Sequence, residues 1–191
     1  MSTDRSEGYE DIAEQFMMVR SDSGARFVRR WARENLPPAS AIVDVGCGSG
    51  VPIAAALIED GFKLFGIDAS SSLLAAFRDR FPGAPATCEA AQDSAFFART
   101  FDAAVSIGLL FLLSEEDQAT VLPRVAHALR PGGRFLFTAP RQRCEWQDVL
   151  TDRPSRSLGA REYGRLLEAS GLQLVGCHAE ENYFYDAIKL G

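Results

Sequence analysis

The sequence predicts an α/β fold in which a mostly parallel sheet is covered by helices on both faces. Short apolar runs alternate with helical patterns along the chain, as in strand–helix–strand units. A glycine-rich loop follows the first apolar run. Sheets of this kind bind ligands at the carboxyl ends of their strands, so this loop marks the candidate site.

The helices are expected from apolar spacing and from capping signals. Ile12, Phe16 and Val19 recur at helical spacing. Ser23 is a candidate cap for a second helix, and Ser114 with Asp117 is close to a capping box. We expect helices over residues 9–20, 24–36, 52–60, 70–81, 114–129 and 160–170.

The strands are expected where short apolar runs stop at glycine, proline or polar turns. They cover residues 41–45, 62–67, 85–89, 101–107, 134–138, 172–177 and 183–188. The last two are expected to form an antiparallel hairpin. Residues 139–158 are expected to form a long loop, and loops of that length in compact domains are often functional.

Length and composition fit one domain with a sizeable core. The chain has 191 residues, of which 47% are hydrophobic. We expect a single domain over residues 1–191, with the helices of residues 1–38 as a candidate lid. The net charge of −6 argues against a nucleic-acid or anionic-membrane partner.

Cysteine usage and hydropathy predict a cytoplasmic protein without a metal site. The four cysteines form no C-x-x-C pair, and zinc sites need clustered ligands. The polar first ten residues lack the apolar core of a signal peptide. No apolar stretch approaches the roughly 18–20 residues that span a bilayer.

The sharpest motif is an acidic residue two positions before three alternating glycines. Asp44 precedes Gly46, Gly48 and Gly50 at a strand-to-helix junction. Glycine permits close approach of the backbone to a ligand, and the following helix presents free N–H groups. A dinucleotide fingerprint needs its third glycine where Val51 stands.

This loop and four later segments, in order, resemble the Rossmann-like (class I) S-adenosylmethionine-dependent methyltransferases of the small-molecule type. The later segments are Phe65–Ser70, Ala91–Asp93, Phe101–Gly108 and Leu129–Phe135. The resemblance implies a three-layer fold with a seven-stranded sheet in the order 3-2-1-4-5-7-6. It also implies S-adenosyl-L-methionine as cofactor and S-adenosyl-L-homocysteine as product.

The resemblance assigns cofactor contacts to named positions. Asp68 is expected to accept from the ribose hydroxyls, against the alternative of a helix cap. Asp44 is expected to order the loop at the methionine end, which is compatible with a structural hydrogen bond. Asp93 either accepts from the adenine amino group or caps a short turn. The expected cofactor contacts are Asp44, Gly46, Gly48, Gly50, Asp68, Ala69, Asp93, Ser94 and Ile107.

The acceptor site is expected over the methyl group, between the N-terminal helices and the loops after the fourth and fifth strands. By elimination the acceptor is a small molecule. Its expected contacts are Tyr9, Phe16, Arg141, Trp146 and Tyr183. No catalytic acid or base is assigned, because in this family the cofactor carries the chemistry.

Two alternatives remain open at this point. A nicotinamide-dependent oxidoreductase also uses a glycine loop, although Val51 and the spacing of Asp44 argue against it. A non-catalytic S-adenosylmethionine-binding protein would carry the same cofactor motifs.

Overall fold

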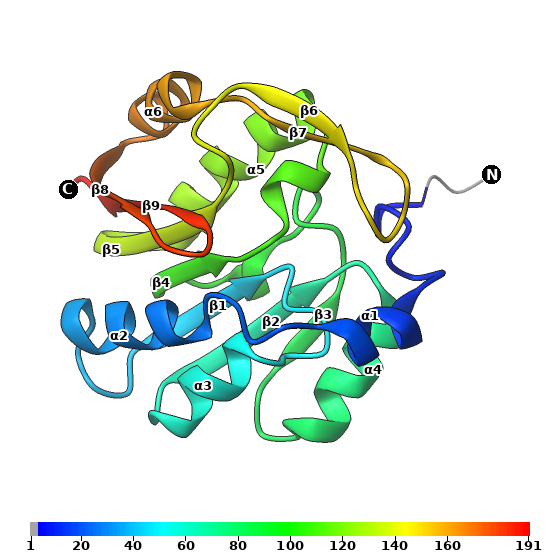
Figure 1. The fold of residues 1–191 in the computed structure, drawn as a ribbon. Coiled ribbons are helices and arrows are strands. Elements are labelled where there is room, and N and C mark those ends of the chain that lie inside the picture. The colour runs from blue at the N-terminus through cyan, green and yellow to red at the C-terminus, as the bar shows by residue number, and fades with distance from the viewer. Residues whose placement is uncertain (1–3) are drawn as a thin grey trace.

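The computed structural model describes residues 4–191; residues 1–3, which begin the polar N-terminal segment, lie outside it. A seven-stranded sheet forms the middle layer, in the order β3-β2-β1-β4-β5-β9-β8 (Figure 1). Its strands are β1 (Ala41–Val45), β2 (Lys63–Asp68), β3 (Ala86–Cys88), β4 (Phe101–Ser106), β5 (Leu129–Thr138), β8 (Leu172–Ala179) and β9 (Tyr183–Lys189). The first five pair in parallel, and β9 is antiparallel to β5 and β8.

This topology confirms the expected strand order and the expected C-terminal hairpin. The last two sheet strands are labelled β9 and β8 because a separate hairpin precedes them in the chain. The helices are α1 (Ala13–Val19), α2 (Ala25–Asn35), α3 (Ile53–Glu59), α4 (Ser71–Arg80), α5 (Glu115–Ala128) and α6 (Ala160–Ala169), with short 3-10 turns η1 (Phe96–Ala98) and η2 (Leu110–Leu112).

Two apolar clusters fill the spaces on either side of the sheet. Helices α2, α3 and α4 contribute to one cluster, and α5 and α6 to the other. Successive strand residues point to opposite faces. Ile42 therefore joins the first cluster and Val43 the second, and Leu136 and Phe137 divide in the same way.

Three local expectations are wrong. The first helix begins at Ala13 rather than at residue 9, because residues 5–12 form turns tied to other parts of the chain. Ser23 does not cap α2: the cap position is Gly24, and Ser23 Oγ accepts from Asn182 instead. Ser114 does cap α5, accepting from the Asp117 N–H at 3.0 Å.

The third correction concerns residues 139–158, which are not one long loop. They contain an antiparallel hairpin of β6 (Cys144–Gln147) and β7 (Pro154–Ser157), which lies across η2 and α5. Its strands are four residues long and partly exposed, so their apolar pattern is too weak to be recognised. Packing of Trp146 against Phe111, with ring centroids 5.5 Å apart, helps to hold the hairpin down.

Candidate functional site

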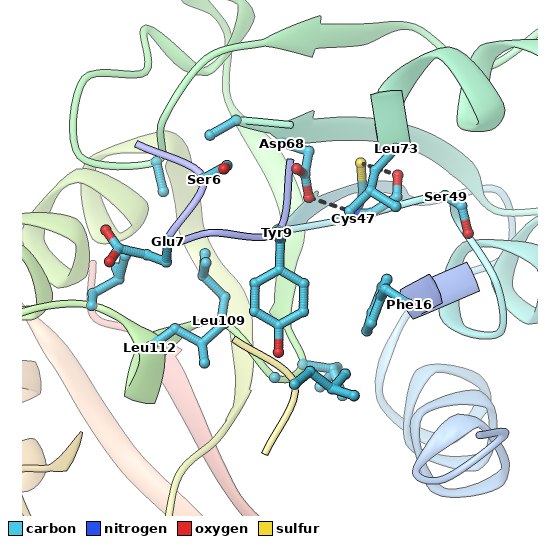
Figure 2. A pocket seen from close by; sticks show the side chains of 18 of the residues that line it. Ser6, Glu7, Tyr9, Phe16, Cys47, Ser49, Asp68, Leu73, Leu109 and Leu112 are labelled. Atoms are coloured by element: carbon cyan, nitrogen blue, oxygen red, sulfur yellow. Dashed lines mark hydrogen bonds between the residues drawn. The ribbon is translucent and has the colours of Figure 1, made fainter. Parts of the chain in front are cut away.

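A cavity of about 320 Å³ opens at the carboxyl ends of β1, β2 and β4 (Figure 2). Its floor is the glycine loop and the segment Ile67–Ala69. The N-terminal segment covers it from one side, and the tip of the β6–β7 hairpin from another. This is the edge at which parallel sheets bind ligands, and the volume lies in the range of small-molecule sites.

The backbone of the glycine loop is fixed by hydrogen bonds to β2. The N–H groups of Gly46 and Cys47 donate to the carbonyl of Ile67 at 2.8 and 3.0 Å. Gly46 has a φ of +80°, and a Cβ there would lie 2.8 Å from Leu109. Glycine is therefore required for the cavity floor to pass under Leu109.

Gly50 has a different reason to be glycine. Its φ is +80°, and a Cβ on it would lie 2.8 Å from Phe77 of α4. Gly46 and Gly48 line the cavity, whereas Gly50 lies behind it. Gly50 thus permits the packing of α4 against the loop, and the structure does not bring it to the cavity.

Asp68 links the loop to the end of β2. Its Oδ2 accepts from the Gly48 N–H at 2.7 Å, and its Oδ1 accepts from the Ser70 N–H at 2.8 Å. Ser70 itself caps α4, through its Oγ and the Leu73 N–H. Each carboxylate oxygen keeps capacity for a further hydrogen bond. Asp68 lines the cavity and is available to two ligand hydroxyls.

Asp44 is an acid without a partner. It is 2% exposed, and within residues 4–191 no hydrogen bond reaches its carboxylate. Burial raises its pKa to about 7; the charge of Asp68 acts in the same direction, and Arg20 opposes the shift. The structural hydrogen bond left open for this residue is not formed. Asp44 is also absent from the cavity lining, so the structure does not bring this expected contact to the cavity surface.

The segment after β3 brings different residues to the cavity from those expected. Ala91 and Gln92 line the wall. Asp93 lies outside it, pairs with Arg5 at 3.1 Å, and its side chain is 58% exposed. Ser94 is buried behind the wall and accepts from the Phe96 N–H. Ala69 and Ile107 line the cavity as expected.

The N-terminal segment is tied across the cavity at several points. Asp4 pairs with Arg153 at 2.8 Å, and the Tyr9 hydroxyl donates to Asp148 at 3.3 Å. Glu10 accepts from three consecutive serine hydroxyls at the start of α4, those of Ser70, Ser71 and Ser72, at 2.6, 2.9 and 2.7 Å.

Two of the expected acceptor residues meet in the cavity wall. The rings of Tyr9 and Phe16 lie edge to face with centroids 5.1 Å apart, and both line the cavity. Arg141, Trp146 and Tyr183 do not line it. The hairpin reaches the cavity through its tip, Asp148–Leu150, instead.

Several lining residues have no counterpart in the sequence expectations. They are Ser6, Glu7 and Arg20 of the N-terminal segment, the hairpin tip, and most of the apolar run after β4, namely Leu109 and Phe111–Leu113. The residues after β4 are apolar one after another, without the alternation of a strand. This pattern is the one sequence signal that could have placed them at the cavity. The other residues reach the cavity through distant contacts.

The cysteine and acidic side chains show no arrangement typical of a metal centre. Among residues 4–191 no three histidine, cysteine or acidic side chains gather as metal ligands would. Burial, together with the charges of Asp44 and Asp68, raises the pKa of the Cys47 thiol, so this buried thiol is not activated as a nucleophile. None of the helices in the same range combines the length and apolarity of a bilayer crossing.

Comparisons with known proteins agree with this geometry. Residues 42–133 match a family model described as a methyltransferase domain. A fatty-acid O-methyltransferase of Mycolicibacterium smegmatis is 33% identical over 128 residues, which are 63% of this chain and 45% of that protein. A tRNA (carboxymethyluridine(34)-5-O)-methyltransferase of Xenopus tropicalis is 31% identical over 130 residues, 68% of this chain and 20% of that protein. The chain thus spans less than half the length of these relatives.

Solved structures share the fold across nearly the whole chain. The 1,6-didemethyltoxoflavin-N1-methyltransferase of Burkholderia thailandensis superposes with a TM-score of 0.78 at 19% identity, covering 98% of this chain and 87% of that one. An S-adenosylmethionine-dependent methyltransferase of Clostridium acetobutylicum superposes with a TM-score of 0.74 at 14% identity. The match covers 96% of this chain and 99% of that one. Residues 42–133 are therefore a methyltransferase domain, and the chain has the fold of the Rossmann-like S-adenosylmethionine-dependent methyltransferases.

Proposed function

We propose that this protein binds S-adenosyl-L-methionine and transfers its methyl group to a small-molecule acceptor. The observation that carries the proposal is the set of groups on the cavity floor. Asp68 and the Gly48 amide stand together on this floor at the end of β2. Asp44, on β1, is buried outside the cavity lining and accepts no hydrogen bond from residues 4–191. A ribose diol is the ligand feature that a carboxylate such as Asp68 binds.

Each part of the cofactor would contact a different part of the cavity lining. Asp68 would accept from the ribose hydroxyls, with Ala69 beside the sugar. Ala91 and Gln92 would flank the adenine. Gly46 and Ile107 would meet the methionine portion through their backbones, next to Asp44. When bound, the cofactor supplies an electrophilic methyl group on a sulfonium. The protein holds the acceptor in line with that group and keeps water out.

The acceptor is small and has an apolar part. The cavity is about 320 Å³, and the N-terminal segment and the hairpin tip narrow its entrance. The wall beyond the cofactor groups is formed by Tyr9, Phe16, Leu109, Phe111, Val149 and Leu150. A relative whose name gives fatty acids as its acceptor is consistent with this wall. The net charge of −6 disfavours nucleic acid.

We propose further that residues 1–191 act as one domain in the cytoplasm. The family match and the fold together extend over one continuous sheet and its covering helices. The four cysteines are free thiols, as is usual in the reducing environment of the cytoplasm, and this supports the proposed location.

Calorimetric titration with S-adenosylmethionine, S-adenosylhomocysteine and NAD tests the cofactor. Binding of the first two without NAD is expected. Failure of both to bind would reject the proposal, and binding of NAD alone would favour an oxidoreductase. Methyl transfer is then tested by release of S-adenosylhomocysteine with a panel of aliphatic acids, alcohols and amines. Cofactor binding with no turnover on any acceptor would point to a non-catalytic binding protein.

A further inference from the structure

Three exposed valines line the cavity from three separate segments. They are Val19 at the end of α1, Val51 after the glycine loop and Val149 at the tip of the β6–β7 hairpin, with exposed fractions of 55%, 39% and 94%. Six large apolar side chains of residues 4–191 are exposed, so half of them stand where this cavity opens. Exposed apolar side chains that gather in one place mark a binding surface, whereas scattered ones need no explanation.

Val149 is held at the opening by hydrogen bonds of its neighbours in the hairpin tip. One oxygen of the Asp148 carboxylate accepts from the N–H groups of Leu150 and Thr151 at 3.1 and 2.9 Å. The other oxygen accepts from the Tyr9 hydroxyl at 3.3 Å. These bonds fix the backbone on both sides of Val149 while its side chain stays exposed. The position of this apolar side chain is therefore set by a hydrogen-bonded turn.

Tyr9 also connects the hairpin tip with α1. The rings of Tyr9 and Phe16 lie edge to face with centroids 5.1 Å apart, and both line the cavity (Figure 2). Val19 follows Phe16 by three positions, so the two side chains lie on one side of the helix. The apolar wall of the cavity therefore continues outward from Phe16 to Val19, and from Leu150 to Val149.

The size of the exposed surface and of the cavity indicates what covers these valines. A specific protein interface buries more than about 1,000 Å², and three valine side chains on separate segments offer far less. The cavity of about 320 Å³ is at the lower end of small-molecule sites, and it must hold the cofactor together with the reacting end of the acceptor. The rest of a longer acceptor would lie over the valines, where an apolar group gains most by leaving water.

We propose that the acceptor is an amphiphile whose reacting end lies in the cavity and whose aliphatic chain leaves it over Val19 and Val149. This inference rests on the proposed function and names the class of its acceptor: a molecule with one polar reacting group and a hydrocarbon chain longer than the cavity. The exposed valines are then specificity residues. They select for the chain and take no part in methyl transfer.

The test compares ligands that share a head group and differ in chain length. Hexanoate with dodecanoate and hexylamine with dodecylamine are the two pairs, so the effect of the chain is measured independently of the head group. Each ligand is titrated by calorimetry into the complex with S-adenosylhomocysteine, below its critical micelle concentration. The wild type is compared with the double variant Val19→Ser, Val149→Ser. Val175→Ser is the matched control, since Val175 is an exposed valine of β8 that does not line the cavity.

We expect the longer ligand of at least one pair to bind the wild type about tenfold or more tightly than the shorter one. Full burial would give roughly fourfold for each added methylene, and a chain that lies over an open rim is buried on one side. The double variant should lose about fivefold or more for the longer ligand, because serine offers less apolar surface. Its affinities for the shorter ligand and for S-adenosylhomocysteine should match those of the wild type, as should every affinity of Val175→Ser. Thermal unfolding verifies that each variant is folded.

The inference is overturned if neither pair favours the longer chain, including the case in which no member of a pair binds. It is also overturned if the double variant binds the longer ligand as the wild type does, or loses affinity equally for both chain lengths. An equal loss in Val175→Ser would overturn it as well, because the chain would then adhere to exposed valines away from the cavity. Failure of S-adenosylhomocysteine to bind the wild-type protein would instead reject the proposed function.

Discussion

Asp68 accepts two backbone N–H groups and still faces the cavity. The same carboxylate holds the shape of the glycine loop and, in the proposed function, accepts from the ribose hydroxyls. Asp93 has the opposite setting, since it lies outside the cavity lining and its charge is matched by Arg5. The local chemistry of the two residues is alike, and their partners decide which one is available.

Asp68→Ala tests the ribose contact. We expect the affinity for S-adenosylhomocysteine to fall by about 1–3 kcal/mol, because the ligand hydroxyls and the Gly48 N–H lose their acceptor. Calorimetry measures the change. Asp79→Ala, an exposed aspartate of α4, is the control. An unchanged affinity in Asp68→Ala would remove this residue from the site.

Asp44 makes stability depend on pH in a defined direction. Its pKa is raised from 3.8 to about 7 by burial, so the folded state keeps a proton that the unfolded state releases. The stability that the folded state gains by holding this proton is fully present below about pH 4. It is lost as the pH rises through about 7. We expect urea unfolding to show less loss of stability over this range in Asp44→Asn than in the wild type. Parallel pH profiles of the two proteins would contradict this.

At the scale of elements, the loop between β1 and α3 and the N-terminal segment form the two sides of one site. The loop is shaped by left-handed glycines and by bonds to Ile67 and Asp68. The N-terminal segment has little regular structure and is held by polar contacts to other elements. The loop therefore provides a fixed floor, and the segment provides a cover whose removal requires few bonds to break.

The loop conformation predicts the effect of Gly48→Val. Gly48 has a φ of +54°, which a β-branched residue adopts only under strain. A Cβ at this position would lie 3.6 and 4.0 Å from its nearest neighbours, so the variant should fold. We expect loss of S-adenosylhomocysteine binding by calorimetry, with a cooperative thermal transition retained. Gly83→Val is the control, because nothing lies near its Cβ position. Wild-type binding by Gly48→Val would mean that the loop does not approach the ligand.

The cover is fastened at Glu10, whose carboxylate accepts from Ser70, Ser71 and Ser72. These bonds hold the pKa of Glu10 down at about 2, so the contact persists at neutral pH. We expect Glu10→Ala to speed both the hydrogen exchange of residues 4–12 and the dissociation of S-adenosylhomocysteine. Glu14→Ala, on the exposed side of α1, should change neither. Equal dissociation rates in Glu10→Ala and the wild type would show that this contact does not retain the ligand.

At the scale of the whole molecule, two apolar clusters position the site by fixing the sheet from both faces. Phe137 on β5 is fully buried, and its ring stacks on that of Tyr185 with centroids 4.8 Å apart. This stack joins the parallel part of the sheet to its antiparallel edge. The carboxyl ends of the strands, and with them the cavity floor, depend on that continuity.

Phe137→Ala tests this dependence. We expect the free energy of unfolding to fall by about 3–5 kcal/mol, through lost burial and the cavity left behind. Urea denaturation measures the loss. Met18→Ala, at a side chain 80% exposed, should change stability by less than about 0.5 kcal/mol. A similar small change in Phe137→Ala would mean that neighbouring side chains move in to fill the space.

The sequence by itself determined the order of strands and helices, the sheet edge that carries the site, and the residues of the glycine loop and Asp68. These features depend on local patterns: alternation along a strand, helical spacing, and glycines at one turn. Segments with weak local patterns were missed or misplaced, as in the short strands β6 and β7 and the late start of α1.

Only the tertiary structure decided what covers the site and which charges remain available in it. The Tyr9–Asp148 contact joins residues 139 positions apart, and Glu10 reaches Ser70 across 60 positions. Asp93 lies outside the cavity and pairs with Arg5, whereas Arg20 lines the cavity and forms no ion pair with any of residues 4–191. The physical reason is that a charged side chain takes its role from its partners in space, and those partners leave no trace in the local pattern of the chain.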